Sequence, residues 1–361
     1  MRRQQQRSIG RMLTGLGCHN VRSSKVQLLE QVNSKLEIPG FLCKSGTVAF
    51  IGAAEEMGQP LAGTARGPAL LRKAGVREML TSLGWRVEDL GDVDGKATKE
   101  NDDDEASDSS SMRNGPAVIR GCRRLYDKAK AAHLGGRMVV TVGGDHSIAL
   151  GSVAAALDAR PETRVLWVDA HADANTPETS QSGNMHGMPL AFLLGIADHP
   201  LVDFVKNPLE PSRLAYVGLR DIDPAEKQIL RSLRAQGTFI ATMHDVDKHG
   251  IGHVMRLALQ SLGYDDEKDE NDHRKNLAPL HLSYDVDAID PQLAPSTGTV
   301  VRGGLSFREA HYVCEAAWNT GALGSMDMVE VNDSVGDANA ARETIELAAS
   351  LIASACGDTL L

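Results

Sequence analysis

The chain has 361 residues, enough for one large α/β domain or two modest domains with a sizeable core. Its formal net charge of −10 at pH 7 argues against nucleic acid as a partner. No apolar run in the sequence is long enough to cross a bilayer, so we expect no membrane partner. The five cysteines are scattered without a C-x-x-C pair, which indicates free thiols in a reducing compartment.

The first 30 residues differ in composition from the rest of the chain. They are rich in arginine, and their first acidic residue is Glu30. Four apolar residues of this stretch fall on one helical face: Ile9, Met12, Leu13 and Leu16. This pattern is typical of an organellar transit peptide, and a disordered basic tail is the alternative. We therefore expect an N-terminal extension at 1–46, a mitochondrial location with the cytoplasm as the alternative, and one catalytic domain at 47–361.

From residue 47 the chain alternates between strand-like and helix-like segments. Amphipathic segments rich in alanine and leucine include 67–84 and 115–136. Seven runs have the composition of buried strands: 47–53, 137–143, 163–169, 213–219, 238–243, 280–286 and 322–331. The alternation predicts a single three-layer α/β domain, a parallel β-sheet flanked by helices. Such sheets bind ligands beyond the carboxyl ends of their strands.

Two acidic, apolar-poor segments, 98–115 and 264–276, interrupt this alternation. Neither buries enough apolar surface to offset the entropy of ordering, so both are predicted to be mobile surface insertions. Calcium binding is the alternative, but the acidic residues lack EF-hand spacing.

Ionisable residues follow several of the predicted strands. "GGDHS" places His146 after a glycine turn, although a turn with a helix N-cap is an equal alternative for this motif alone. "WVDAHADANT" places Asp169, His171 and Asp173 at alternate positions, which an extended chain would point to one side. Two further strands end in the same kind of residue, namely Asp285 with Asp287, and Glu330.

A buried cluster of this kind needs a counter-charge. Burying unpaired charges costs several kcal/mol per ion by rough estimate, and a divalent metal removes that cost. The cluster has two histidines, four aspartates and no thiolate, which is too many ligands for a four-coordinate structural zinc. Oxygen-rich sites suit Mn²⁺ or similar hard ions, and six ligands with bridging carboxylates suit two of them. Two metals sharing a water indicate metal-assisted hydrolysis.

Three motifs, "GGDHS", "DAHAD" and "SYDVDAIDP", resemble the metal signatures of the ureohydrolases, the family of arginase, agmatinase and guanidinobutyrase. The resemblance runs from about residue 47 to the C-terminus, interrupted by the two acidic segments. It implies a single α/β domain and two Mn²⁺ ions per subunit. The implied ligands are His146, Asp169, Asp173 and Asp285 for one ion, and Asp169, His171, Asp285 and Asp287 for the other.

Two further segments are similar to those of arginases in particular. "NTPETSQSGNMHG" resembles the loop that receives an α-amino acid, which implies that Asn175 and Ser182 bind the α-carboxylate with support from Asn184. "GLRDIDPAE" resembles the segment in which Asp223, beside Asp221, contacts the α-amino group. Ordinary turn chemistry is the alternative for any one of these residues. The expected reaction is hydrolysis of L-arginine to L-ornithine and urea.

The same resemblance implies roles for four residues around the scissile bond. A hydroxide between the metals would attack the guanidinium carbon, which Glu330 would anchor while Thr299 lined the pocket. Asp173 would pass a proton to the leaving amine. His186 would exchange protons with bulk solvent, a task that its ordinary pKa of about 6.5 suits.

The resemblance also implies a homotrimer, with Arg308 and Glu309 of "GGLSFREAHYV" at the subunit interface. A solvated helix start is the alternative for this pair. Two rival functions stay open: a ureohydrolase for agmatine or a guanidino acid, and a non-catalytic relative without metal.

Overall fold

A computed structural model describes residues 46–94, 111–264 and 277–359. The predicted transit peptide and most of both acidic segments lie outside the described residues. Met112 and Tyr264 fall within the bounds predicted for these two segments, and both are buried. The Tyr264 hydroxyl also donates a hydrogen bond to the carbonyl of Ala278, which ties this end of the second segment to the core. Within the described parts of the chain, no helix is long and apolar enough to span a membrane.

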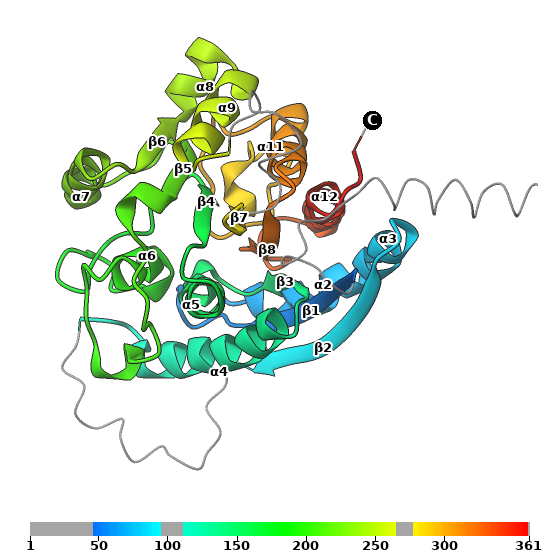
Figure 1. Cartoon of the computed structure of the whole chain (residues 1–361), viewed down its shortest axis with the longest axis horizontal. Coiled ribbons are helices and arrows are strands. Elements are labelled where there is room, and N and C mark those ends of the chain that lie inside the picture. Colours follow the sequence, from blue (N-terminus) through cyan, green and yellow to red (C-terminus); the bar gives the residue numbers. More distant parts are fainter. Residues whose placement is uncertain (1–45, 95–110, 265–276, 360–361) are drawn as a thin grey trace, which may run out of the picture.

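The core of the molecule is a single eight-stranded sheet in which every neighbouring pair is parallel (Figure 1). Its spatial order is β2-β1-β3-β8-β7-β4-β5-β6. The strands are β1 (Thr47–Ala54), β2 (Arg86–Asp94), β3 (Met138–Gly143), β4 (Arg164–Val168), β5 (Leu214–Leu219), β6 (Phe239–Thr242), β7 (Leu280–Asp285) and β8 (Leu323–Val329). The predicted parallel α/β sheet is confirmed, and β2 is an additional strand at its edge.

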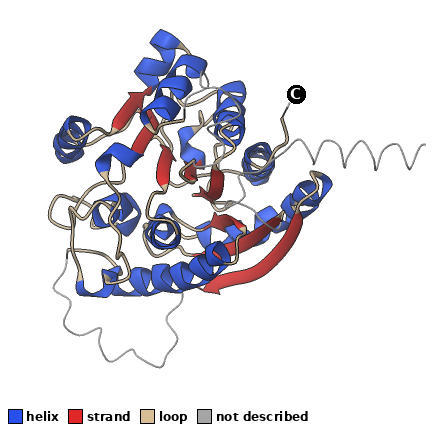
Figure 2. Ribbon diagram, viewed as in Figure 1, coloured by secondary structure: helices blue, strands red, loops and turns tan. Residues whose placement is uncertain are grey.

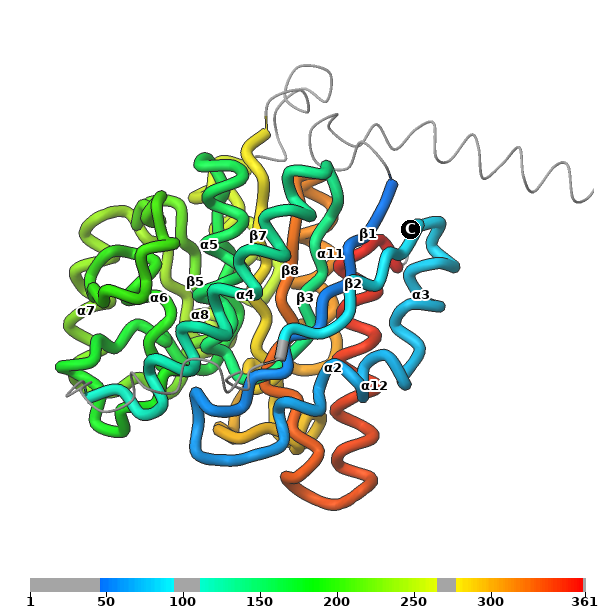
Figure 3. Tube along the Cα trace, turned by 90° about the horizontal axis from the view of Figure 1, so that it is seen from below, coloured from blue at the N-terminus to red at the C-terminus, as the bar shows by residue number. Residues whose placement is uncertain are grey.

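Helices cover both faces of the sheet, as Figure 2 shows. One face packs against α2 (Gly67–Lys73), α3 (Val76–Ser82), α8 (Met243–His249), α9 (Ile251–Ser261), α11 (Phe307–Asn319) and α12 (Ala338–Ala355). The other packs against α4 (Gly115–Leu134), α5 (Ala149–Ala159), α6 (Pro189–Leu193) and α7 (Pro224–Ala235). In Figure 3 α4 and α5 lie in front of the central strands. The predicted three layers are therefore present, with an apolar core on each side of the sheet.

Strands that lie far apart along the chain become neighbours at the centre of this sheet. β3, β8, β7 and β4 are adjacent, and all of them run in the same direction. Their carboxyl ends therefore meet at one edge, and the loops that follow them carry the ionisable motifs. This edge is the place where a ligand site is expected in a parallel α/β sheet.

Candidate metal centre

His146 occupies the centre of the sheet edge, one short turn after β3. Gly144 makes that turn possible, because a Cβ at this position would lie 2.2 Å from the backbone oxygen of Glu55. The imidazole stacks on Trp167 with ring centroids 4.1 Å apart. Its Nε2 lies 2.9 Å from the hydroxyl of Ser283. Together these contacts fix the ring so that Nδ1 faces the ends of β4 and β7.

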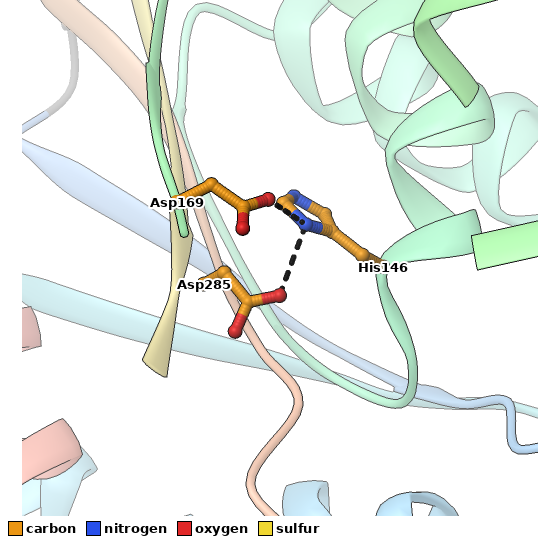
Figure 4. Close-up of side chains that lie close together, drawn as sticks. All are labelled: His146, Asp169 and Asp285. Carbon is orange, nitrogen blue, oxygen red and sulfur yellow. Dashed lines mark ion pairs between the residues drawn. The ribbon is translucent and has the colours of Figure 1, made fainter. Parts of the chain in front are cut away.

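Three carboxylates surround Nδ1 of His146. The oxygens of Asp169, Asp173 and Asp285 lie 3.0, 3.1 and 3.2 Å from it. Figure 4 shows the Asp169 and Asp285 carboxylates converging on the ring. Among the described residues Nδ1 has no hydrogen-bond partner of acceptable geometry, although it is fully buried. A buried nitrogen without a hydrogen bond, facing three carboxylates, fits a metal ligand whose other ring nitrogen is held by a hydroxyl.

A second cluster lies beside the first and shares Asp169 with it. The Asp169 carboxylate directs Oδ2 at His146 and Oδ1 at Nδ1 of His171, the latter over 3.4 Å. Asp287 lies 3.1 Å from the same nitrogen of His171. Ligand atoms of the two trios come close enough to hold one ion each: His146, Asp169 and Asp285, and Asp169, His171 and Asp287. The arrangement brings together all six metal ligands expected from the sequence.

The route by which these ligands converge differs from the predicted one. Strand β4 ends at Val168, and the residues after it turn instead of continuing as an extended chain. The backbone N–H of His171 donates to the Asp169 carboxylate over 2.7 Å, and Asp173 adopts a left-handed backbone with φ of 48°. The alternation of side chains along an extended strand therefore does not explain the spacing of Asp169 and His171. The aspartate side chain closes a turn that places the next ligand two residues later.

The carboxylates of the centre repel one another when no cation is present. Burial and the neighbouring Asp169 raise the pKa of Asp173 to about 6. Burial, Asp287 and Asp169 raise the pKa of Asp285 well above its ordinary value. The pKa of His171 rises against the effect of burial, because Asp287 and Asp169 favour the imidazolium. A divalent cation would relieve this repulsion, so the donor set fits a hard metal ion bound by oxygen and imidazole.

Glu330 connects His146, one of the candidate metal ligands, to His186. It follows β8 in a left-handed conformation with φ of 64° and is buried. Its Oε1 accepts the backbone N–H of His146 at 2.9 Å and lies 3.1 Å from Nδ1 of His186. Its Oε2 accepts the amide of Gln59 at 3.1 Å. Burial lowers the pKa of His186, but the Glu330 carboxylate outweighs it and raises the pKa to about 9. The expected role of His186 in exchanging protons with solvent rests on its ordinary pKa of about 6.5. In the metal-free protein the pKa of His186 is higher than that value.

A cavity of about 180 Å³ leads from the metal cluster to the surface. Its two ends have different chemistry, with metal ligands at the bottom and polar residues of the β4 and β5 loops above them. The residues that line it are His171, Asp173, Asn175, His186, Gly187, Asp221, Asp223, Glu226, Asp285 and Thr299. The cavity therefore admits a small, polar and positively charged molecule.

The substrate residues expected from the sequence are placed unequally around this cavity. Asn175 donates its amide to Asp223 over 2.6 Å, and both line the cavity. Thr299 lines it too and donates its hydroxyl to Asp287. Ser182 and Asn184 lie on the same loop as Asn175, outside the described lining. Ser182 instead accepts the backbone N–H of Asn184 over 3.2 Å.

Two side chains near the cavity, the carboxyl of Glu226 and the amide of Gln59, were not among the expected site residues. Burial and Asp173 raise the pKa of Glu226 to about 8, and this side chain lines the cavity beside Asp223. An acidic residue in the first turn of a helix is ordinary, which hides Glu226 in the sequence. Gln59 reaches Glu330 from a loop distant in sequence, and only the fold reveals that contact.

A parallel α/β sheet with a buried carboxylate and imidazole cluster at its carboxyl edge defines a metal-dependent hydrolase. The Arginase family model matches residues 46–357 of the chain. An arginase of Glaciozyma antarctica is 40% identical over 326 residues, covering 89% of this chain and 90% of that protein. The chain belongs to the arginase family.

Solved structures agree with this assignment. An arginase from Bacillus caldovelox superposes with a TM-score of 0.76 at 35% identity, covering 87% of this chain and 99% of that one. An Entamoeba histolytica arginase in complex with L-ornithine gives a TM-score of 0.74 at 28% identity, covering 86% of this chain and 98% of that one. The fold resemblance therefore spans nearly the whole of each solved chain.

Proposed function

We propose that this protein hydrolyses L-arginine to L-ornithine and urea. One observation carries the proposal: a single cavity joins the two groups of candidate metal ligands to the charged carboxylate of Asp223. The first feature suits hydrolysis of a guanidinium, and the second suits an α-ammonium group at the other end of the substrate. The family membership and the arginases among its relatives support the same reaction.

The donor set fits two Mn²⁺ ions per chain, a number and an identity that belong to this proposal. His146, Asp169, Asp173 and Asp285 would hold the first, and Asp169, His171, Asp285 and Asp287 the second. When bound, such a pair supplies a water that is nucleophilic at neutral pH. The side chains of this protein would bind and orient the substrate and transfer the protons.

Glu330 and His186 have complementary tasks. The Glu330 carboxylate is buried and oriented by three donors, so a guanidinium that reaches it gains a charge-assisted hydrogen bond. Such a guanidinium competes with His186 for Oε1 of Glu330. His186 then loses the partner that raises its pKa, and it releases a proton more easily near neutral pH. Its side chain is 16% exposed, which places it between the cluster and solvent.

Asp173 is suited to hold a proton close to the scissile bond. The carboxyl lines the cavity, so it can accept a proton from the attacking water and donate it to the leaving amine.

Asp223 and Asn175 are proposed to bind the α-amino acid end. Burial opposes ionisation of Asp223, but hydrogen bonds from Asn175 and from two backbone N–H groups lower its pKa below the ordinary value. Asp223 is therefore ionised at neutral pH and attracts an ammonium. An agmatine molecule lacks the α-carboxylate, so it has no use for the amide donor of Asn175.

Steady-state urea release tests the proposal. The purified chain is loaded with Mn²⁺ and assayed on L-arginine, agmatine and 4-guanidinobutyrate, before and after chelation. We expect kcat/KM to be highest for L-arginine and activity to disappear on chelation and return with Mn²⁺. A preference for agmatine would assign the chain to another ureohydrolase activity. Full activity after chelation, with no metal detected, would remove the metal mechanism.

We also propose a homotrimer in which α11 contributes to the interface. Phe307 and Tyr312 are 52% and 42% exposed on this helix, beside the exposed Arg308. Within the chain, the Glu309 carboxylate accepts the backbone N–H of Ser306 in a capping box. Sedimentation should give three times the mass of one chain, and Arg308→Glu should reduce it. A monomer at micromolar concentration contradicts the trimer.

A further inference from the structure

Arg220 lies directly after β5 and points its guanidinium at the loop that carries Asp287. Three successive carbonyls of that loop accept its hydrogen bonds, at 2.6, 3.1 and 3.3 Å for Asp287, Ala288 and Ile289. The same guanidinium donates to the carbonyl of Val301 at 2.8 Å and to that of Gly218 at 3.3 Å. One side chain therefore joins the end of β5 to the two loops that carry Asp287 and Thr299.

The backbone of Arg220 contacts the segment that carries the other two side chains of this ligand group, Asp169 and His171. Its N–H donates to the carbonyl of Ala170 over 2.9 Å, and the N–H of Asp221 donates to the same carbonyl. Ala170 is the residue between Asp169 and His171. The N–H of Ala170 in turn lies 3.3 Å from Oδ1 of Asp287. Arg220 thus contacts both segments whose side chains make up the trio Asp169, His171 and Asp287.

The chemistry of this contact is specific to arginine. A planar guanidinium has five N–H donors in a fixed plane, so it can satisfy several carbonyls that converge from different segments. A lysine ammonium has three donors on a flexible stem and cannot reproduce that arrangement. Burial lowers the pKa of Arg220, while Asp287 and Asp169 oppose that shift. The positive charge stays beside the carboxylates and helps to keep them together before an ion arrives.

We propose that Arg220 is the positioning residue of the second metal subsite, and that it sets how tightly Asp169, His171 and Asp287 hold an ion. The first subsite shares Asp169 with the second, and it also depends on His146, Asp173 and Asp285. Among the described residues, Arg220 contacts none of these last three by a recorded hydrogen bond. Loss of Arg220 therefore weakens the second subsite more than the first. The inference rests on the proposed metal-dependent function.

The test compares Arg220→Met with Arg213→Met in the full-length chain. Arg213 precedes the opposite end of the same strand, where its guanidinium also donates to a backbone carbonyl, that of Pro161 at 2.6 Å. Mn²⁺ binding is followed by calorimetric titration of the metal-free proteins and by metal content after gel filtration. Electron paramagnetic resonance distinguishes a coupled pair of ions from a single ion. Urea release is measured separately.

We expect Arg220→Met to bind one Mn²⁺ with nearly unchanged affinity and the next at least tenfold more weakly, with loss of the coupled signal. Arg213→Met should bind both like the unmodified chain. If Arg220→Met does not fold, Arg220→Lys takes its place, and the same selective loss is expected. Unchanged binding in a folded Arg220 variant, or equal loss in Arg213→Met, overturns the inference. Selective metal loss in a chain that never hydrolyses arginine would support this inference and refute the proposed function.

Discussion

At the scale of single residues, one local arrangement recurs around the site. An aspartate at a strand end accepts the backbone N–H of the residue two positions later. Asp145, Asp169, Asp285 and Asp223 all do so, and in two of the four cases the residue that donates is itself a ligand of the cluster. The D-x-H and D-x-D spacings therefore have a structural cause. The first carboxylate fixes the backbone that presents the second ligand.

Asp223 provides a test of the amino acid end of the cavity. Its Oδ1 also caps α7 by accepting two backbone N–H groups, so truncation to alanine would combine two effects. Asp223→Asn preserves a capping oxygen and removes the charge. A hydrogen bond to a charged group contributes about 1.5–3 kcal/mol, so we expect KM for L-arginine to rise roughly ten- to hundredfold.

Steady-state kinetics on L-arginine and on 4-guanidinobutyrate, which lacks the amino group, measure this effect. The control is Asp337→Asn, which changes the same kind of cap at α12, away from the cavity. It should leave both substrates unaffected. Equal losses on the two substrates in Asp223→Asn would show that this residue does not bind the α-amino group.

Glu330→Gln tests the link between the guanidinium anchor and His186. Removing the carboxylate charge removes the main cause of the raised pKa, so the His186 pKa should fall from about 9 to its ordinary value or below. NMR titration of the imidazole in the metal-free protein measures this directly. Turnover of L-arginine should fall by about a hundredfold or more, as expected when a charge-assisted contact is lost at the reacting centre. A His186 pKa that stays near 9 would show that Glu330 does not control it.

At the scale of elements, the apolar strands were predictable, including the edge strand β6, and the charged edge strand β2 was not. The seven predicted strands are present because each is an apolar run; six of them lie in the interior of the sheet, and β6 lies at one edge. Strand β2 has the sequence RVEDLGDVD and pairs only with β1. Because one of its edges is open to solvent, it tolerates charges that hide its periodicity.

The segment predicted to be helical over 67–84 is divided for an equally local reason. Gly75 adopts a left-handed φ of 88°, and it ends α2 before α3 begins. The composition of the segment predicted helix correctly but gave no sign of the break.

Some site residues could be predicted from short sequence motifs, whereas others depend on contacts between segments that are distant in the sequence. Motifs pointed to the six side chains that cluster at the sheet edge, because each strand end carries its own short signature. The contacts of Gln59, Glu226 and Arg220 depend on which loops meet at the sheet edge. That meeting follows from the strand order, which no single segment of the sequence contains.

The turn between β3 and His146 is the element most sensitive to substitution. In Gly144→Ala the new Cβ would lie 2.2 to 2.8 Å from backbone atoms of Glu55 and Ala53, so β1 and the turn would have to separate. We expect a loss of about 1–3 kcal/mol in the free energy of unfolding, together with weaker Mn²⁺ binding.

Chemical denaturation of the metal-free and metal-loaded proteins measures both effects. Gly252→Ala in α9 is the matched control, because its nearest neighbour, the hydroxyl of Tyr312, lies at an ordinary 3.5 Å. That variant should be neutral or more stable by up to about 1 kcal/mol. Similar behaviour of the two variants would contradict the close approach at Gly144.

At the scale of the whole molecule, the site lowers the stability of the metal-free protein. Folding raises the pKa of Asp173 to about 6 and that of Glu55 to about 7, in both cases through burial first and a neighbouring carboxylate second. Between the ordinary and the raised pKa, the native chain binds more protons than the unfolded chain. The free energy of unfolding therefore falls as pH rises through that interval.

We expect metal-stripped protein to melt several degrees higher near pH 5.5 than near pH 7.5. The Mn²⁺-loaded protein should show the opposite trend, because metal binding requires deprotonated ligands and stabilises only the native state. Thermal melting across this pH range, with and without chelator, measures both slopes. A metal-free melting temperature that rises with pH would show that the buried carboxylates are not the dominant titrating groups.

The order of the central strands has a consequence for synthesis of the chain. His146 follows the third strand to be translated and Asp285 ends the seventh, yet the two side chains face each other across the finished sheet. A nascent chain that has emerged only as far as β4 presents His146 and Asp169 without their partners, and such long-range pairing is slow to form. Ion capture is therefore a late event, available only to a chain that has closed its sheet. An ion at about 100 times its Kd then adds about 2.7 kcal/mol to that state, so the cellular supply of the metal ion becomes a determinant of how much of this protein survives proteolysis.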